Sequence, residues 1–214
     1  ELKIVAEGAS IPETSVRTQE NLVRLRKRGR MLVASYEAIR FQRLDLFTVT
    51  LRQIGAAIAR AQLRDAVEVL VGGDGNGNAA ETADTAVAGT LTYADIVGFW
   101  NLFDPYELNA LIAAPDVAVK ILNIAEFKDA AAGFRFQSTG GQITPLGADM
   151  MKSPAVAAGT LVGLDKNCAL EMVKAGDIVT EYDKLIDRQL ERAAITCTAG
   201  FAKIFKDAAR VLSV

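Results

Sequence analysis

The 214-residue chain carries 24 basic and 26 acidic residues and no histidine. The near balance of charge argues against a generic nucleic-acid-binding protein, which would carry a strong basic excess. The lack of histidine removes the commonest general base and the commonest metal ligand, so it lowers the expectation of an enzyme without excluding one. Hydrophobic residues make up 50% of the chain, which is enough for the core of one domain or two small ones.

Cysteine content and hydropathy bear on location. Cys168 and Cys197 lie far apart and form no CxxC pair, so we expect two reduced thiols and neither a zinc nor a redox motif. No apolar stretch reaches the ~20 residues needed to cross a membrane, and no secretory signal is recognisable. The chain begins at Glu1 without a methionine, and we therefore expect an upstream region that is not part of this sequence.

The first 34 residues have extended character. Residues 2–6 are expected to form a strand that ends before Pro12, because proline cannot donate to a ladder. Residues 21–34 mix apolar and basic side chains, and this pattern predicts two strand segments joined near Gly29.

A cluster of basic residues lies in this extended region. Its members are Arg17, Arg24, Arg26, Lys27, Arg28 and Arg30. They could contact DNA through phosphates, pair with carboxylates of an adjacent subunit, or simply be solvated. No aromatic residues are interleaved with them, so stacking on bases is not suggested. Solvated or inter-subunit charges are the favoured interpretation.

Residues 44–71 carry the clearest helical pattern, with Asp45 as the predicted N-cap. The apolar side chains predicted to face inward are Phe47, Leu51, Ile54 and Ile58. At ~1.5 Å per residue the helix would be a rod of roughly 39 Å, which is too long for the interior of a small domain. The glycine-rich residues 72–78 end the pattern.

The glycine-rich segment invites two motif interpretations, and both fail. A phosphate-binding loop would need a lysine followed by serine or threonine after the glycines, and none follows. A calcium-binding EF-hand loop would match Asp74, Asn76 and Asn78 but would need glycine in place of Ala79 and glutamate in place of Thr85. We interpret the segment as a helix stop whose glycines adopt the left-handed conformation.

Shorter elements of both kinds follow. Helices are expected over residues 93–102, capped by Thr92, and from Pro115 to about residue 121. Residues 130–145 are expected to be a loop. Strands are expected over residues 109–113, 160–164, 169–173, 187–204 and 209–212, with 160–164 paired to 169–173. Because helices and strands do not alternate regularly, the fold class is predicted as α+β with a mixed or antiparallel sheet.

Two further groups of side chains receive the ordinary interpretation. Phe99, Trp100 and Phe103 are expected to be core residues and not a ligand platform. Residues 183–192 alternate acidic and basic side chains and are predicted to form a solvated or intermolecular ladder of ion pairs. No catalytic, cofactor-binding or metal-binding residue is predicted.

Several weak motifs occur in an informative order. An extended Glu7-Gly8 stretch with Ile11-Pro12-Glu13 is followed by the basic strand pair, Val33-Ala34-Ser35-Tyr36-Glu37, the long helix and a Gly-Asp-Gly turn. Residues 157–165, 169–172 and 200–204 complete the order. In this order the sequence resembles the major capsid proteins of tailed bacteriophages of the Hong Kong 97 type.

The resemblance implies the α+β Hong Kong 97-type capsid fold, in which a long spine helix packs on a mixed or antiparallel sheet. Residues 1–34 would be the returning limb of an extended loop and the strands that follow it. Residues 35–90 would be a peripheral domain with its spine helix at 44–71, residues 91–182 an axial domain, and residues 183–214 strands that return to the peripheral domain. The family's N-terminal arm and the outgoing limb of the loop have no counterpart in this chain.

The implied function is that of a head protein whose pentamers and hexamers self-assemble into an icosahedral shell around phage DNA. The expected partners are other copies of the chain, scaffold and portal proteins, and packaged DNA bound without sequence preference. No cofactor, membrane or enzymatic activity is expected, and the location would be the virion after assembly in the bacterial cytoplasm. The alternatives are an encapsulin-like compartment, which has the same fold but encloses cargo enzymes, and more remotely a histidine-free enzyme.

Overall fold

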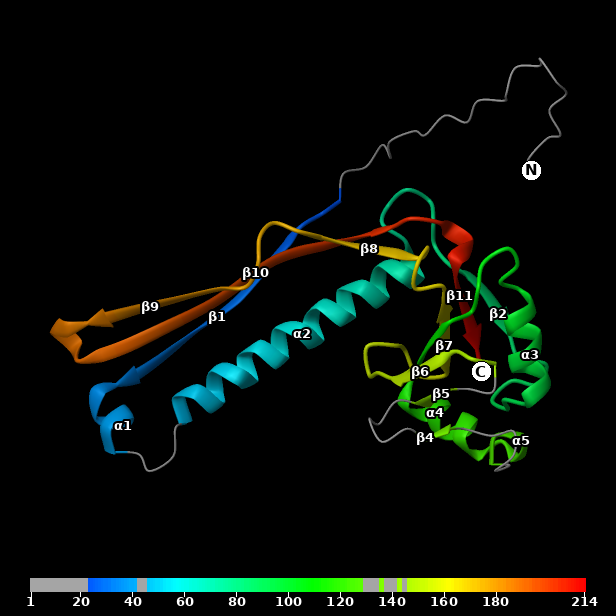
Figure 1. The fold of residues 1–214 in the computed structure, drawn as a ribbon, viewed down its shortest axis with the longest axis horizontal. Coiled ribbons are helices and arrows are strands. Elements are labelled where there is room, and N and C mark those ends of the chain that lie inside the picture. The colour runs from blue at the N-terminus through cyan, green and yellow to red at the C-terminus, as the bar shows by residue number, and fades with distance from the viewer. Residues whose placement is uncertain (1–22, 42–45, 129–134, 137–141, 144–145) are drawn as a thin grey trace, which may run out of the picture.

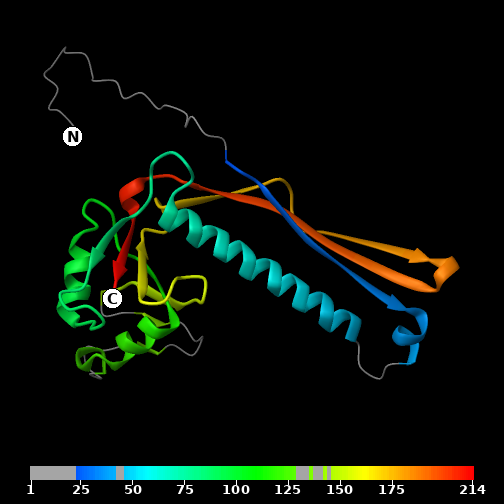
Figure 2. The ribbon, with the colours of Figure 1, turned by 180° about the vertical axis from the view of Figure 1, so that it is seen from behind.

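The computed structural model describes residues 23–41, 46–128, 135–136, 142–143 and 146–214. The described chain forms an elongated arm that projects from a compact unit (Figures 1 and 2). Each part is built on its own sheet, with four strands in the arm and seven in the compact unit. The helix α2 (Leu46–Gly72) runs along the arm and reaches the compact unit at its C-terminal end.

The arm is organised around the long strand β10 (Leu190–Lys203). One edge of β10 pairs antiparallel with β1 (Arg26–Ser35) over the whole length of β1. The other edge pairs with β9 (Val179–Leu185) near the outer end of the arm and with β8 (Leu170–Lys174) near the compact unit. A short helix, α1 (Tyr36–Phe41), follows β1 at the outer end.

The helix α2 covers one face of β1 and β10. Ile54 and Ile58 are buried against Ile195 and Cys197 of β10, as the spacing predicted. Leu51 is only partly buried in the same contact, and Phe47 is also half-buried. The ribbon formed by β1 and β10 is narrow and covers one side of α2 only in part. The inward residues of α2 are therefore less buried toward the outer end of the arm. The predicted cap, Asp45, lies outside the described residues.

The compact unit is built on a mixed sheet. The strands in spatial order are β2 (Glu81–Asp84), β11 (Ala209–Ser213), β7 (Thr160–Leu164), β3 (Ala110–Ala113), β6 (Asp149–Lys152), β5 (Gln142–Ile143) and β4 (Arg135–Phe136). β2 pairs parallel with β11 and β3 pairs parallel with β6, while the other pairs are antiparallel. The α+β class with a mixed sheet is therefore confirmed.

Three helices pack with this sheet: α3 (Tyr93–Asn101), α4 (Pro115–Asn123) and α5 (Ala125–Lys128). Thr92 caps α3 as predicted, with a reciprocal bond from its own backbone to Asp95. Phe99 and Phe103 are buried edge-to-face with ring centroids 5.4 Å apart. Trp100, however, is 46% exposed, so its assignment to the core was wrong. It lies about 100° round the helix from Phe99, beside the buried face.

Two predicted strand boundaries are also corrected. β1 is one continuous strand and not two segments joined near Gly29. Gly29 lies opposite Thr196, and a Cβ there would come within 2.7 Å of the Thr196 Cγ2 atom, so this glycine permits close strand packing and makes no turn. The segment expected to be extended from residue 187 opens instead with a 3₁₀ turn, Ile186–Arg188, and Gln189 at φ 51°, which reverse the chain from β9 into β10.

The strands predicted over residues 160–164 and 169–173 both form, but they do not pair with each other. β7 belongs to the seven-stranded sheet and β8 to the four-stranded sheet. Between them the buried Asp165 carboxylate accepts hydrogen bonds from the backbone of Glu107, the side chain of Asn109 and the backbone of Asn167. These bonds hold the turn on the compact unit, and they hold the pKa of Asp165 below its usual value despite the opposing effect of burial. The chain then leaves that sheet for the arm.

Candidate assembly surfaces

The arginines of β1 divide according to the face of the strand on which they lie. Side chains alternate along a strand, and Arg26 and Arg28 share the face turned toward α2. Arg26 Nη1 lies 2.8 Å from Asp65 Oδ1, and Arg28 Nη2 lies 2.6 Å from the same oxygen. Arg26 also pairs with Glu68 at 3.0 Å. Two members of the predicted basic cluster are therefore neutralised within the chain.

This cluster of ion pairs joins β1 to α2. Asp65 is a buried carboxylate, and a buried charge is tolerated only when it is paired and hydrogen-bonded. Hydrogen bonds and charge attraction from Glu68 and Asp65 raise the pKa of Arg26 above its ordinary value. The cluster joins residues almost forty positions apart in sequence, so neighbouring positions in the sequence gave no signal for it.

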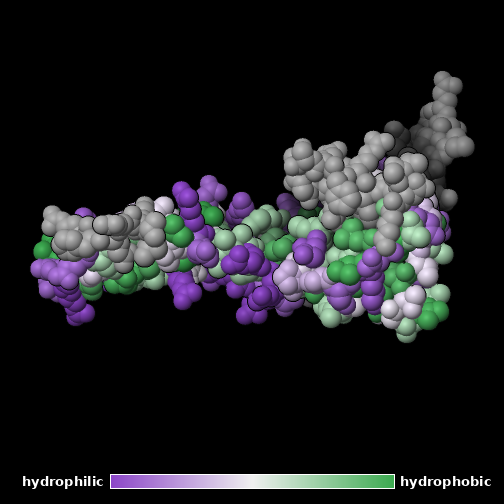
Figure 3. Space-filling model, turned by 90° about the horizontal axis from the view of Figure 1, so that it is seen from below, coloured by the Kyte–Doolittle hydropathy of each residue, from purple (hydrophilic) through white to green (hydrophobic). Residues whose placement is uncertain are grey.

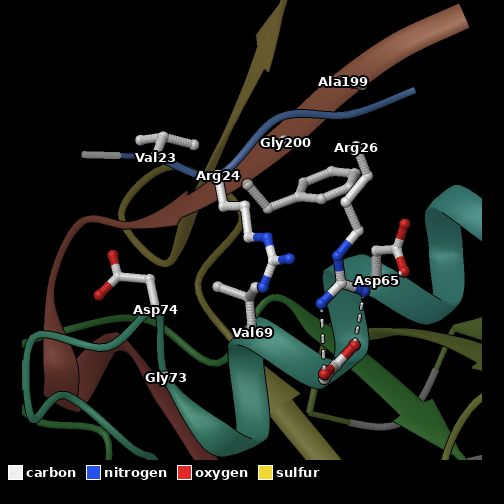
Figure 4. Close-up of a pocket in the computed structure, with 11 residues that line it drawn as sticks. Val23, Arg24, Arg26, Asp65, Val69, Gly73, Asp74, Ala199 and Gly200 are labelled. Carbon is white, nitrogen blue, oxygen red and sulfur yellow. Dashed lines mark hydrogen bonds and ion pairs between the residues drawn. The ribbon is translucent and has the colours of Figure 1, made fainter. Parts of the chain in front are cut away.

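The remaining basic residues of β1 and its approach are exposed. Arg24, Lys27 and Arg30 have exposed side chains, and Arg24 borders a cavity of about 150 Å³ between β1, β10 and the end of α2 (Figure 4). Arg17 lies outside the described residues. The cluster recognised in the sequence is thus partly internal and partly available at the surface.

A buried lysine, which the sequence analysis missed, anchors the other end of the arm. Lys203 ends β10, is fully buried and donates from Nζ to the Leu70 carbonyl of α2 at 3.0 Å. A cation is favourable at the C-terminal end of a helix, but burial lowers the pKa of this ammonium to about 8. Its backbone N–H donates to Asp74 Oδ2 at 3.0 Å. A lysine at the end of a strand gives no sequence signal for such burial.

The glycine-rich segment is therefore structural. Gly73, Gly75 and Gly77 have positive φ angles of 82°, 98° and 70°, which confirms the predicted left-handed helix stop. Asp74 accepts hydrogen bonds from Asn76 as well as from Lys203. Within the described ranges no three or more Asp, Glu or Cys side chains gather in a group that could hold a metal ion.

The face of the arm turned away from α2 exposes apolar side chains. Met31 is 55% exposed and Val33 48% on β1, and Val179 is 50% exposed on β9. The register places these residues on the same face as Gly29 and Thr196. At the outer tip Ile186 is 80% exposed. An arm with apolar residues on its uncovered face and at its tip presents a surface for another protein molecule.

The charged residues near this tip pair within the chain. Lys184 pairs with Glu191 at 2.8 Å, and Asp183 pairs with Arg192, both across the β9–β10 register. The predicted ladder is thus an intramolecular set of cross-strand pairs, because the unforeseen strand β9 brings the two halves of the pattern side by side. Among the helices that the structure describes, none has the length and apolar character needed to cross a membrane.

Comparison with known proteins identifies the family. The family model described as phage capsid protein matches residues 18–202, which is most of the chain. The chain belongs to the phage capsid protein family. The resemblance stated from the sequence, to the major capsid proteins of tailed phages, is confirmed. A comparison with curated proteins found no match.

Solved structures show the fold of this capsid protein. The capsid of the native GTA particle superposes with a TM-score of 0.70 at 16% identity, over 100% of this chain and 80% of that chain. The capsid of cyanophage P-SCSP1u gives 0.70 at 14% identity, with the same coverage of 100% and 80%. The holo-SrpI encapsulin complex from Synechococcus elongatus gives 0.66 at 12% identity, over 88% and 73%. The Hong Kong 97-type fold is therefore confirmed, and the capsid protein is a structural subunit of a shell.

Proposed function

We propose that this capsid protein assembles as pentamers and hexamers into a closed icosahedral shell that encloses phage DNA. The observation that supports it best is the projecting arm. Its sheet is covered by α2 on one face and exposes apolar side chains on the other. Burying such side chains contributes roughly 25 cal/mol per Å². No described segment of this chain covers them, and a second copy is the proposed cover. Subunits that exchange arms in this way form large interfaces of the obligate kind.

The two parts of the chain have separate roles in this proposal. The compact unit, which includes most of residues 91–164, serves as the axial domain around the symmetry axes. The arm serves as the peripheral domain, with α2 as its spine and residues 1–34 leading into it. Since β8 and β9 pair with β10, residues 170–185 are assigned to the arm together with β10.

The exposed basic residues Arg24, Lys27 and Arg30 are assigned to contacts with carboxylates of a neighbouring copy. Scaffold and portal proteins complete the set of partners. The proposed location is the virion, after assembly in the cytoplasm of the host bacterium. The chain has no proposed enzymatic role or cofactor.

Electron microscopy of the full chain produced in bacteria tests the proposal. We expect closed shells from the wild type, and folded but unassembled protein from Ile186→Asp, because the substitution puts a charge at the exposed tip. The matched variant Ile186→Val keeps an apolar contact and should still form shells. Wild-type protein that stays monomeric at high concentration would refute the proposed shell, and shells from Ile186→Asp would show that the tip is not an assembly contact.

An encapsulin-like compartment is the alternative, because the encapsulin named above has the same fold over 88% of this chain. The two functions differ in what the shell contains. Purified shells with nuclease-protected DNA support the phage head, whereas shells that contain a second protein species and no nucleic acid support the compartment.

A further inference from the structure

The exposed side of α2 carries a row of arginines that differ from those of β1. These residues are Arg52, Arg60 and Arg64, and we call them the α2 strip. All three are exposed. At ~100° per residue they lie roughly 100° or more round the helix from the side that Ile54 and Ile58 bury. In Figure 3, which views the molecule from the side where α2 lies beneath the ribbon, hydrophilic residues gather along the middle of the arm.

The charge of the α2 strip is not neutralised by its own helix. Asp65 and Glu68 are the only acidic residues of α2, and both are engaged by Arg26, with Arg28 also on Asp65. None of the three strip arginines forms an ion pair with any other residue that the structure describes. The arginines of β1 therefore pair with both carboxylates of α2, and the outer side of the helix keeps its positive charge.

The surroundings of the strip favour a polyanion over an apolar protein surface. Gln53, Ala56 and Ala57, which are exposed between the arginines, are polar or small, and the exposed apolar Val49 lies a turn before Arg52, outside the strip. From Arg52 to Arg64 the helix rises about 18 Å, at ~1.5 Å per residue. Double-stranded DNA carries one charge per ~1.7 Å of its axis, so several phosphates fall within this length. Guanidinium groups bind phosphates well.

We infer that the α2 strip contacts the phosphate backbone of enclosed DNA, and that the outer side of α2 therefore faces the interior of the shell. This inference rests on the proposed function and names the surface that the genome would touch. The contact is independent of base sequence, because contacts to phosphates carry no sequence information. The opposite face of the arm, with Met31 and Val179, is left for protein contacts.

The test compares two triple variants of the full chain with equal loss of charge. The first replaces Arg52, Arg60 and Arg64 by glutamine. The control replaces Lys152, Lys166 and Lys206 by glutamine, which are exposed residues of the compact unit. Binding of unassembled protein to a random-sequence DNA duplex is measured by fluorescence anisotropy between about 50 and 200 mM salt. Shell formation is followed in parallel by electron microscopy.

For the strip variant we expect normal shells, at least tenfold weaker DNA binding, and a salt dependence whose log–log slope is smaller by roughly 2 to 3. The control should bind DNA like the wild type within about twofold. Equal loss in both variants, unchanged binding by the strip variant, or a wild type that does not bind DNA would overturn the inference. A strip variant that alone loses shell formation would also overturn it, since the arginines would then contact a neighbouring copy. Failure of the proposed function differs from all of these, because it would appear as the absence of wild-type shells.

Discussion

Replacing Asp65 by asparagine should separate the ribbon from the helix more than any other single charge removal in the arm. The carboxylate accepts hydrogen bonds from Arg26 Nη1 at 2.8 Å and from Arg28 Nε at 3.0 Å and Nη2 at 2.6 Å. Asparagine is isosteric, but it removes the negative charge and turns an NH₂ group toward a guanidinium. Both arginines then lose a partner, and no other acidic residue of α2 is available except Glu68.

The expected loss follows from the burial of the two partners. The Asp65 side chain is 11% exposed, whereas those of Arg26 and Arg28 are 41% and 35% exposed. Removing one member of a fully buried pair costs about 3–5 kcal/mol. Here the arginines can recover water, so solvent screening reduces the expected loss to about 2 kcal/mol. For a chain of this size that corresponds to a fall of roughly 4–8 °C in the melting temperature.

Thermal and urea unfolding of the unassembled protein measure this effect, with Glu68→Gln as the matched control. Glu68 lies one helical turn further on, also pairs with Arg26, and has a side chain that is 61% exposed. Its replacement should therefore cost less than about 1 kcal/mol. Equal losses of stability for the two variants would refute the argument from burial.

Three further outcomes are expected. Gly163→Ala should destabilise the compact unit by about 1–3 kcal/mol, since its Cβ would lie 2.7 Å from a Phe99 ring carbon. Gly98→Ala has nothing within 4 Å of the added Cβ and should stabilise α3 by roughly 0.5–1 kcal/mol. Unfolding in urea compares the two variants. The pKa of Lys203 is about 8 in the fold against an ordinary 10.5, so the unfolded chain binds more protons between these pH values. As the pH rises through this range, the wild type should gain stability relative to Lys203→Met, on the order of 2–3 kcal/mol. A stability difference that is flat from pH 7 to 10 would contradict this. Ile54→Asp should give no soluble folded protein, because an unpaired buried carboxylate costs several kcal/mol against a total of roughly 5–15; a soluble variant with the wild-type melting temperature would show that this face is not buried.

Part of the fold could be predicted because the signals are local. The helix over 46–72 follows from the 3.6-residue spacing of Ile54 and Ile58 and from the glycines after it, and the cap at Thr92 follows from one residue type at one position. Of the candidate surface, the sequence identified the basic cluster as a group but gave no information on which members are already paired.

The sheet to which each strand belongs could not be predicted from the sequence pattern. β7 and β8 looked like one hairpin, yet they lie in different sheets because Asp165 holds the turn on the compact unit. β9 is a strand with hardly any buried residue, since it is defined by its pairing with β10 and not by a pattern of its own.

By itself the sequence determined the family resemblance, the long helix with the glycines that end it, and the α+β class. Each of these depends on the order of residues or on their spacing over a short stretch of sequence. Only the tertiary structure decided that Asp65 consumes Arg26 and Arg28, that Lys203 is buried against the end of α2, and that the arginines on the outer side of α2 remain unneutralised. The physical reason is that pairing of charges depends on distance in space. Polar groups separated by 37 to 133 positions come within about 3 Å only after β1 and β10 have folded onto α2.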